Sequence, residues 1–218
     1  FVGFDPQRWA DTRESGTRVP AGGALELDVA DLDLPADVVA ADVAALALTA
    51  TAVDAAAPGF LREVACDSES ATSNVNYTTS NPVPNLVVAA PSEDGRVCVY
   101  SHSDTDVVVD AFGAFAEDAG LVDVSARRFD SRDTGTPVQA GSVTVIDVGD
   151  LTAVEDTPVN GVVLNLTSVG AQAPGFFTAY PCAAGQPATS NLNYADARPV
   201  SNATIVAPDA DGTICVYS

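Results

Sequence analysis

The sequence predicts an all-β protein built from two tandem antiparallel β-sandwich modules of immunoglobulin-like type. One stretch of residues occurs twice at a constant separation, which indicates a duplicated module. Within each module, short segments alternate apolar and polar residues between turn residues, the pattern of strands with one buried face. About seven such segments per module favour a sandwich, with a small barrel as the alternative.

The duplicated stretch carries the motif Ser-Asn-x-Asn-Tyr, followed by a Cys-Val-Tyr segment. The motif begins at Ser73 and again at Ser190, 117 residues later, and Cys98 and Cys215 are separated by the same distance. Two homologous modules explain this long period better than local self-similarity does. We expect a first module over 1–115, a linker over 116–126 and a second module over 127–218 that lacks its last strand.

Alternating residues locate the strands of the first module; Leu25, Leu27 and Val29, for example, alternate with acidic residues. The expected strands lie near residues 24–30, 44–53, 60–66, 72–77, 85–90, 96–101 and 105–115. Asp94-Gly95 and Asp211-Gly212 each precede a strand and are typical of hairpin turns. The Asp- and Ala-rich segment from Leu32 to Asp42 is expected to be a surface loop.

Composition restricts the partners. The chain has 218 residues, 30 acidic against nine basic side chains and a net charge of −21. No basic face can be assembled, so nucleic acid and anionic membrane surfaces are not expected partners. No apolar run is long enough to cross a membrane. The acidity favours solubility and mutual repulsion of surfaces, with a salt-rich habitat or scattered calcium sites as alternatives.

The four cysteines fall into one pair per module. Four cysteines allow three pairings, and the repeat selects Cys66 with Cys98 and Cys182 with Cys215. Their spacing does not suit a compact zinc site, and the chain has a single histidine. Disulfides persist in oxidising compartments, so we expect an extracellular protein, either secreted or attached to the cell surface.

The Ser-Asn-x-Asn-Tyr motif contains the most specific polar residues, Asn74, Asn76 and Tyr77. In the second module they recur as Asn191, Asn193 and Tyr194. The favoured interpretation is structural: the amides satisfy loop backbone groups while the tyrosine packs. The alternative is a ligand-binding site, because asparagine and tyrosine can hydrogen-bond to and stack on sugar rings.

A second recurring motif is Asp-x-Arg, with Asp11 and Arg13 in one module and Asp130 and Arg132 in the other. Arginine that recurs in a chain without lysine suggests bidentate pairing with a carboxylate. We expect structural ion pairs that clamp a strand end, and a ligand carboxylate is the alternative.

Catalysis is not expected. A Ser–His–Asp triad needs a histidine base, and His102 stands alone near a strand end. Pairs of carboxylates arise by chance among so many acids. The acidic turns 92–95 and 209–212 lack the spacing of a calcium-binding EF-hand, so plain turns are favoured, and no cofactor is expected.

Several motifs together resemble a tandem repeat module of secreted actinobacterial surface proteins. They are Asp-Thr-Arg, Leu-Asn-Leu-Thr, Tyr-Pro-Cys, Ser-Asn-Leu-Asn-Tyr, Cys-Val-Tyr and the run 106–115, and they cover nearly the whole chain. The resemblance implies a modular β-rich accessory or scaffold role on large exported proteins and no catalytic residues. The first module departs from it, with Leu48-Thr49-Ala50-Thr51 and Glu63-Val64-Ala65-Cys66 in two of the motifs.

These observations lead us to expect a spacer, stalk or filament subunit rather than an enzyme. A carbohydrate- or cell-wall-binding module is the alternative. Phe1–Phe4 resembles the tail of an earlier copy of the 105–115 segment, and the second module stops where that segment should begin. We therefore expect its missing strand to come from flanking sequence or from a neighbouring protomer in a head-to-tail contact.

Overall fold

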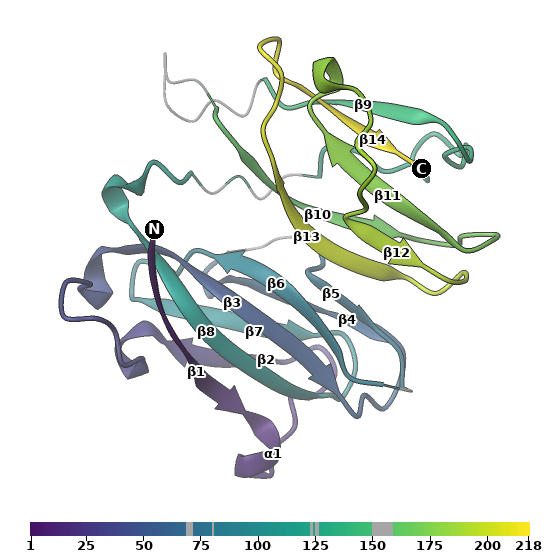
Figure 1. The fold of residues 1–218 in the computed structure, drawn as a ribbon. Coiled ribbons are helices and arrows are strands. Elements are labelled where there is room, and N and C mark those ends of the chain that lie inside the picture. Colours follow the sequence, from purple (N-terminus) through teal and green to yellow (C-terminus); the bar gives the residue numbers. More distant parts are fainter. Residues whose placement is uncertain (69–71, 80, 123, 125–126, 150–158) are drawn as a thin grey trace. The chain divides into compact units, whose positions relative to one another are not determined.

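The computed structural model comprises 218 residues and describes residues 1–68, 72–79, 81–122, 124, 127–149 and 159–218. The chain divides into two compact units, Phe1–Asp123 (unit 1) and Val124–Ser218 (unit 2). The division falls inside the expected linker, of which residues 123, 125 and 126 lie outside the described residues. All strand pairs are antiparallel, which confirms the predicted all-β class (Figure 1).

Unit 1 is a sandwich of two four-stranded sheets, with strand orders β1-β8-β3-β6 and β2-β7-β4-β5. Its strands are β1 (Val2–Asp11), β2 (Ala24–Asp28), β3 (Val43–Val53), β4 (Gly59–Ala65), β5 (Val75–Tyr77), β6 (Val83–Ala89), β7 (Arg96–Ser101) and β8 (Asp106–Ala116). Short helical turns are α1 (Thr12–Ser15), η1 (Val29–Asp31), η2 (Ala40–Asp42) and η3 (Glu117–Ala119).

The core of unit 1 lies between these sheets. Leu46 and Leu48 of β3 and Val107 and Val109 of β8 come from one sheet and are fully buried. Leu61 of β4 belongs to the same cluster from the opposite sheet. Alternation along each strand turns one set of side chains inward, so the pattern that predicted the strands also builds this core.

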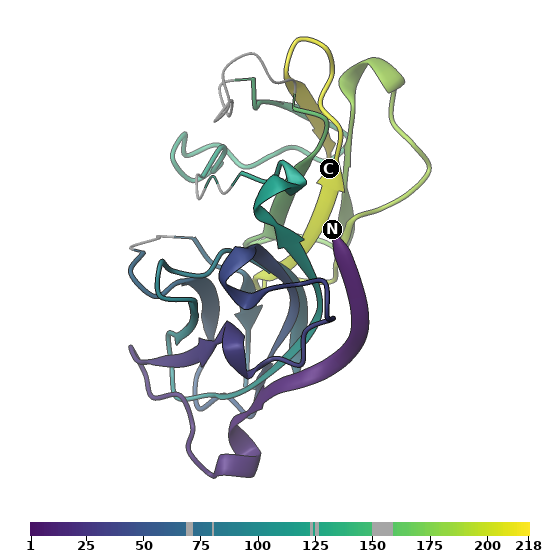
Figure 2. The same ribbon diagram turned by 90° about the vertical axis from the view of Figure 1, so that its left-hand side faces the viewer.

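Strand β1 was not expected from the sequence. It contains Pro6, which cannot donate a ladder hydrogen bond, and its register against β8 shifts between Gly3 and Gln7 and between Arg8 and Ala10. An edge strand tolerates both features because it pairs on one side only. Phe1–Phe4 thus leads into a strand that pairs with β8 of the same unit, and in Figure 2 this strand, in purple, curves along unit 1.

The Asp-Gly turns exist, but the hairpin interpretation is wrong. Gly95 has a left-handed φ of +80° and Gly212 of +78°, conformations that glycine adopts without strain. Asp94-Gly95 joins β6 to β7, and these strands belong to different sheets. The turn is therefore an arch across the sandwich. The same holds for Asp211-Gly212, which joins strands of the two sheets of unit 2.

Unit 2 repeats six of the eight strands. They are β9 (Val143–Asp147), β10 (Val162–Ser168), β11 (Gly175–Tyr180), β12 (Leu192–Tyr194), β13 (Val200–Val206) and β14 (Thr213–Tyr217), with the turn η4 (Cys182–Ala184) after β11. The sheet β12-β11-β14-β9 has the strand order of β5-β4-β7-β2. The other sheet contains only β10 and β13, the counterparts of β3 and β6. Among the described residues, β1 and β8 have no counterpart in unit 2.

Both predicted disulfides are present, Cys66–Cys98 and Cys182–Cys215. Cys66 directly follows β4 and Cys98 lies in β7, and these two strands are neighbours in one sheet. Each disulfide therefore ties adjacent strands of a sheet rather than the two sheets of the sandwich. Such bonds are typical of oxidising, extracellular compartments. Within the described part of the chain, no helix has the length and apolar character needed to cross a membrane.

Candidate functional site

The Ser-Asn-x-Asn-Tyr motif of unit 1 is tied into the sandwich by its own hydrogen bonds. The side-chain oxygen of Asn74 accepts from the backbone N–H of Glu63 at 3.0 Å. The backbone carbonyl of Asn74 accepts from the side chain of Asn85 at 2.6 Å. The amide of Asn76 donates to the hydroxyl of Ser73 at 3.2 Å. These bonds satisfy the loop that enters β5, which is the structural role that the motif predicts.

Tyr77 ends β5 with its ring in the core and its hydroxyl at the centre of a buried polar cluster. The hydroxyl lies 2.9 Å from the Ser101 hydroxyl and 3.1 Å from that of Ser103. It also accepts from the Thr105 hydroxyl at 3.0 Å and from the backbone N–H of Ser103 at 3.2 Å. Residues 103–105 lead into β8, so this tyrosine connects one sheet to the start of the other. It is 3% exposed and is not placed to contact a ligand.

Unit 2 repeats the amide contacts but not the tyrosine cluster. The side-chain oxygen of Asn191 accepts from the Ala179 N–H at 2.7 Å, as Asn74 does in unit 1. The amide of Asn193 donates to the Ser190 hydroxyl at 3.0 Å. The hydroxyl of Tyr194 lies 3.4 Å from that of Ser218, and this tyrosine is half-buried. The amides of the motif thus have internal hydrogen-bond partners in both units, and the tyrosine is less enclosed in the second.

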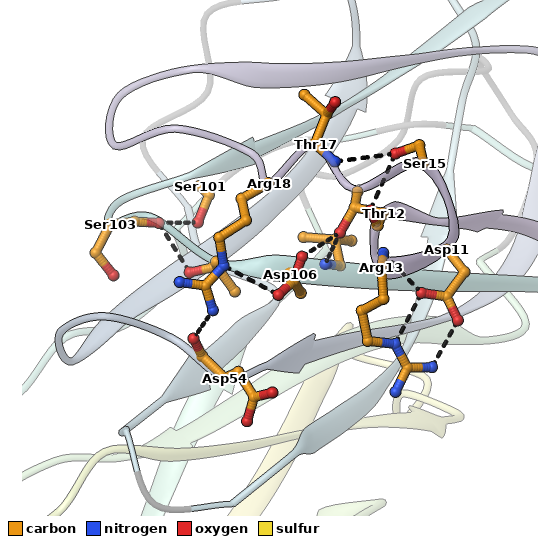
Figure 3. A network of polar contacts seen from close by, with 12 residues as sticks. Asp11, Thr12, Arg13, Ser15, Thr17, Arg18, Asp54, Ser101, Ser103 and Asp106 are labelled. Carbon is orange, nitrogen blue, oxygen red and sulfur yellow. Dashed lines mark hydrogen bonds and ion pairs between the residues drawn. The ribbon is translucent and has the colours of Figure 1, made fainter.

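The expected ion pair of Asp11 and Arg13 lies at the corner where β1 turns into α1 (Figure 3). The Arg13 guanidinium donates to both carboxylate oxygens of Asp11, at 2.8 and 2.6 Å. Asp11 also caps α1 by accepting from the Arg13 N–H, and Arg8 donates to it at 2.9 Å. In unit 2, Arg132 binds Asp130 in the same bidentate way, at 2.9 and 2.5 Å.

A second set of hydrogen bonds, made by Thr12 and Arg18, attaches this corner to β8. The hydroxyl of Thr12 donates to Asp106 at 2.9 Å and accepts from the N–H of Val107 at 2.9 Å. Arg18 donates to Asp106 at 3.0 Å and to the backbone carbonyl of Asp54 (Figure 3). The Asp-Thr-Arg motif therefore clamps the β1 corner onto the first residues of β8, which is a structural role for all three residues.

The clamps alter the acidity of their carboxylates. The hydrogen bonds from Arg13 lower the pKa of Asp11 from 3.8 to about 2. The corresponding bonds from Arg132 hold the pKa of Asp130 well below its usual range. Because the folded-state pKa is lowered, each pair contributes stability above the ordinary pKa of 3.8, and this contribution is lost as the pH falls through the lowered value.

Sequence reasoning missed Glu63, the most unusual titratable group of unit 1. It lies in β4 on the same face as Leu61 and is 4% exposed. Neither of its carboxylate oxygens has a hydrogen-bond partner among the described residues. Burial raises the pKa of Glu63 from 4.5 to about 8. The sequence contains a signal that could have identified Glu63. Its counterpart in unit 2 is Ala179, and a glutamate at this position breaks the apolar alternation of the strand.

Aromatic residues recur on the outer face of the second sheet of each unit. Phe60 and Tyr100 have ring centroids 5.9 Å apart, and their counterparts Phe176 and Tyr217 are 5.7 Å apart. Phe176 is 37% exposed. Together with Ser190 and Asn193, it lines a hollow of about 290 Å³. Asn193, a member of the predicted Asn-Tyr set, thus lies at a surface hollow.

The remaining candidates are His102 and the two acidic turns, and each has contacts within the fold. The ring of His102 stacks on Phe60 with centroids 5.1 Å apart. The acidic turn 92–95 lines a second hollow of about 660 Å³, and the Ser92 hydroxyl donates to Asp94 at 2.5 Å. Asp209 accepts from the Ala183 N–H at 2.8 Å. No group of three or more His, Cys, Asp or Glu able to hold a metal ion occurs among the described residues.

In comparisons with known proteins, no family model matches the chain, and no curated protein or solved structure does either.

Proposed function

We propose that the chain is a structural repeat segment of a secreted or cell-surface protein, acting as a spacer, stalk or filament subunit. The observation that carries this proposal is that the most specific polar motifs make hydrogen bonds and ion pairs within the fold. Asn74, Tyr77 and Asn191 direct their polar atoms into the fold, and Asp11 and Asp130 are bound by arginines. A duplicated motif whose polar groups are used internally supports a role in building the module.

Two further features favour a passive extracellular element. A disulfide in each unit resists unfolding where no cellular reductant is present. A net charge of −21 keeps exposed surfaces apart, which suits an element that separates other domains.

The second candidate function is binding to a carbohydrate or cell-wall glycan as an accessory to an exported enzyme. The favouring observation is the recurring outer-face aromatic pair, Phe60 with Tyr100 and Phe176 with Tyr217. In unit 2 the exposed Phe176 adjoins the hollow beside Asn193. Aromatic rings beside amides are the groups that stack on and hydrogen-bond to sugars.

One experiment separates the two roles. The chain is sedimented with purified cell wall and applied to a glycan array, and the spacer role predicts no saturable binding to either. Saturable binding that is lost in Phe176→Ala and kept in Val145→Ala, a change at another exposed apolar site, would establish the glycan-binding role instead. Tyr77→Ala is unsuitable, because Tyr77 is buried and its loss would disturb the fold.

A further inference from the structure

The sheet β12-β11-β14-β9 of unit 2 carries an exposed aromatic ring beside an amide on its outer face. Phe176 of β11 and Asn193 of β12 are directly opposite each other in the strand pairing, so their side chains lie next to one another. Phe176 is 37% exposed, and Asn193 is exposed as well. Both line the hollow of about 290 Å³ described above. This hollow therefore joins an aromatic surface to a polar group.

The amides at the hollow retain hydrogen-bonding capacity. Asn193 donates one N–H to the hydroxyl of Ser190 at 3.0 Å. Its side-chain carbonyl and its second N–H have no partner among the described residues, and neither has the side chain of Gln186. A primary amide offers two donors and one acceptor. The hollow thus presents both donors and acceptors to a polar ligand.

The wall of the hollow is the segment between β11 and β12, and the fold holds it in place. Thr178 of β11 is fully buried and donates from its hydroxyl to the backbone carbonyl of Thr189. The N–H of Asn191 donates to the carbonyl of Phe177 at 2.8 Å. The disulfide of Cys182 ties the start of the segment to β14. A wall that is already ordered lowers the entropy cost of binding a ligand.

In unit 1, the corresponding aromatic rings are in contact with side chains of the unit itself. The guanidinium of Arg62 lies 4.5 Å from the ring centroid of Tyr100. The ring of His102 stacks on Phe60 with centroids 5.1 Å apart and an interplanar angle of 21°. In β11, Thr178 takes the place of Arg62, so unit 2 has no guanidinium at this position. A ligand that stacked on the rings of unit 1 would have to displace these contacts.

The lining of the hollow restricts the charge of its ligand. None of the lining residues is charged, although the chain has 30 acidic side chains. The lining supplies no arginine for an anion and no carboxylate for a cation, and the net charge of −21 repels anions. An uncharged sugar ring fits this chemistry, because its C–H face can stack on an aromatic ring while its hydroxyls bond to amides. The volume is at the small end of ligand sites, which suits a single ring.

We propose that the hollow of unit 2 binds one uncharged sugar ring of a glycan. The ring stacks on Phe176, and its hydroxyls bond to the amides of Gln186 and Asn193. The inference rests on the glycan-binding role, the second candidate above, and assigns that role to unit 2 and to neutral sugars. Polymers of a neutral hexose and chains of N-acetylated sugars share this chemistry, and the test below separates them.

The first test records nitrogen–proton NMR spectra of the full chain during titration with hexasaccharides of glucose, of N-acetylglucosamine and of a uronic acid. We expect saturable shifts of residues 176 and 186–193 with at least one neutral hexasaccharide, and none with the acidic one. The Kd should be on the order of 1 mM, because one ring buries little surface. The neutral sugar that binds identifies the source of the ligand. No saturable binding of either neutral hexasaccharide, or equal binding of the acidic one, would overturn the proposal.

Matched variants locate the site. Phe176→Leu keeps an apolar side chain beside Tyr217 but removes the aromatic surface, and we expect at least about tenfold weaker binding. Phe60→Leu makes the same change in unit 1 and should leave binding unchanged. Gln186→Ala alters an exposed side chain and should weaken binding about two- to fivefold, which decides the matter if Phe176→Leu lowers the melting temperature of unit 2. Equal effects of the two leucine variants would contradict the assignment to unit 2.

The outcomes separate this site from the glycan-binding role as such. A neutral glycan that shifts residues elsewhere, and binds equally well to Phe176→Leu and Gln186→Ala, would support glycan binding and overturn this site. Absence of binding to every glycan and to purified cell wall would overturn both, and the spacer role would stand. Loss of binding in both variants, with wild-type binding in Phe60→Leu, is the result that the proposal predicts.

Discussion

At the scale of single residues, position in the sandwich decides what each polar group can do. Asp11 and Glu63 are both acids, yet their pKa values shift in opposite directions, to about 2 and about 8. Asp11 lies beside two guanidinium groups that favour its charged form. Glu63 is surrounded by the core, which disfavours charge and offers its carboxylate no partner among the described residues.

Glu63 makes the stability of unit 1 depend on pH. Because its folded-state pKa is raised, the neutral acid is compatible with the fold below pH 4.5, and stability is lost as the pH rises toward 8. We expect wild type to lose on the order of 3 kcal/mol of unfolding free energy between pH 5 and pH 8. Glu63→Gln, which cannot ionise, should show a much smaller loss in urea denaturation.

The control for this prediction is Glu14→Gln, because Glu14 is an exposed acid of α1. This variant should keep the pH dependence of wild type. A Glu63→Gln variant with the same pH dependence as wild type would show that the buried carboxyl is not its source.

At the scale of elements, each disulfide joins neighbouring strands and closes a loop of 32 or 33 residues. Closing loops of this length reduces the entropy of the unfolded chain, which corresponds to roughly 3–4 kcal/mol of stability per unit. The acidic turns are held by hydrogen bonds instead, because Asp94 accepts from Ser92 and Asp211 accepts from Thr213. The turns thus have internal hydrogen-bond partners.

Reduction should lower the melting temperature of both units. Replacing Cys66 and Cys98 by alanine should lower the melting temperature of unit 1 only, with a loss of roughly 3–4 kcal/mol of its unfolding free energy. Calorimetry of wild type, the double variant and the matching Cys182 and Cys215 variant measures this. Non-reducing peptide mapping that joins residues 66 and 182 would contradict the pairing.

We expect removal of calcium by a chelator to leave the stability of both units unchanged. If 92–95 and 209–212 are plain turns held by hydrogen bonds, EDTA should leave both melting temperatures unchanged in moderate salt. Thermal scans with EDTA, calcium and neither are the measurement. A fall of several degrees in EDTA that calcium reverses would establish a calcium site in the chain.

At the scale of the whole molecule, the two units share six strands but differ in how fully their cores are closed. Unit 1 has eight strands, and several of its core side chains are fully buried, among them Leu46, Leu48 and Leu61. The described core of unit 2 is smaller, with Val148 and Ile214 as its large fully buried side chains. The same repeat therefore yields two units of unequal burial.

Unit 2 should unfold first. Its smaller described core buries less apolar surface, and hydrophobic burial is the main source of stability. We expect two calorimetric transitions, with hydrogen exchange faster in β10 than in β3 at every temperature below the first. Coincident transitions, or slower exchange in β10, would show that unit 2 is not the less stable unit.

The sequence alone determined the elements whose causes are local. Alternation along 96–101 predicts a strand because period-two burial is a property of the strand itself, and the duplicated Cys98 and Cys215 select the disulfide pairing. It also marked the Asn-Tyr motifs and the Asp-Arg pairs, whose partners lie mostly within a few residues or in the adjoining strand.

Only the tertiary structure decided the features that depend on distant partners. β1 contains Pro6, and it is a strand because β8, about a hundred residues away, offers it an edge. The Asp-Gly turns look like hairpins, yet their flanking strands pair with others in separate sheets. Tyr77 and Tyr194 have the same local sequence, but only Tyr77 has Ser103 and Thr105 around its hydroxyl. Local patterns specify which segments become strands, whereas burial and pairing depend on which other segments are present to complete the sheet.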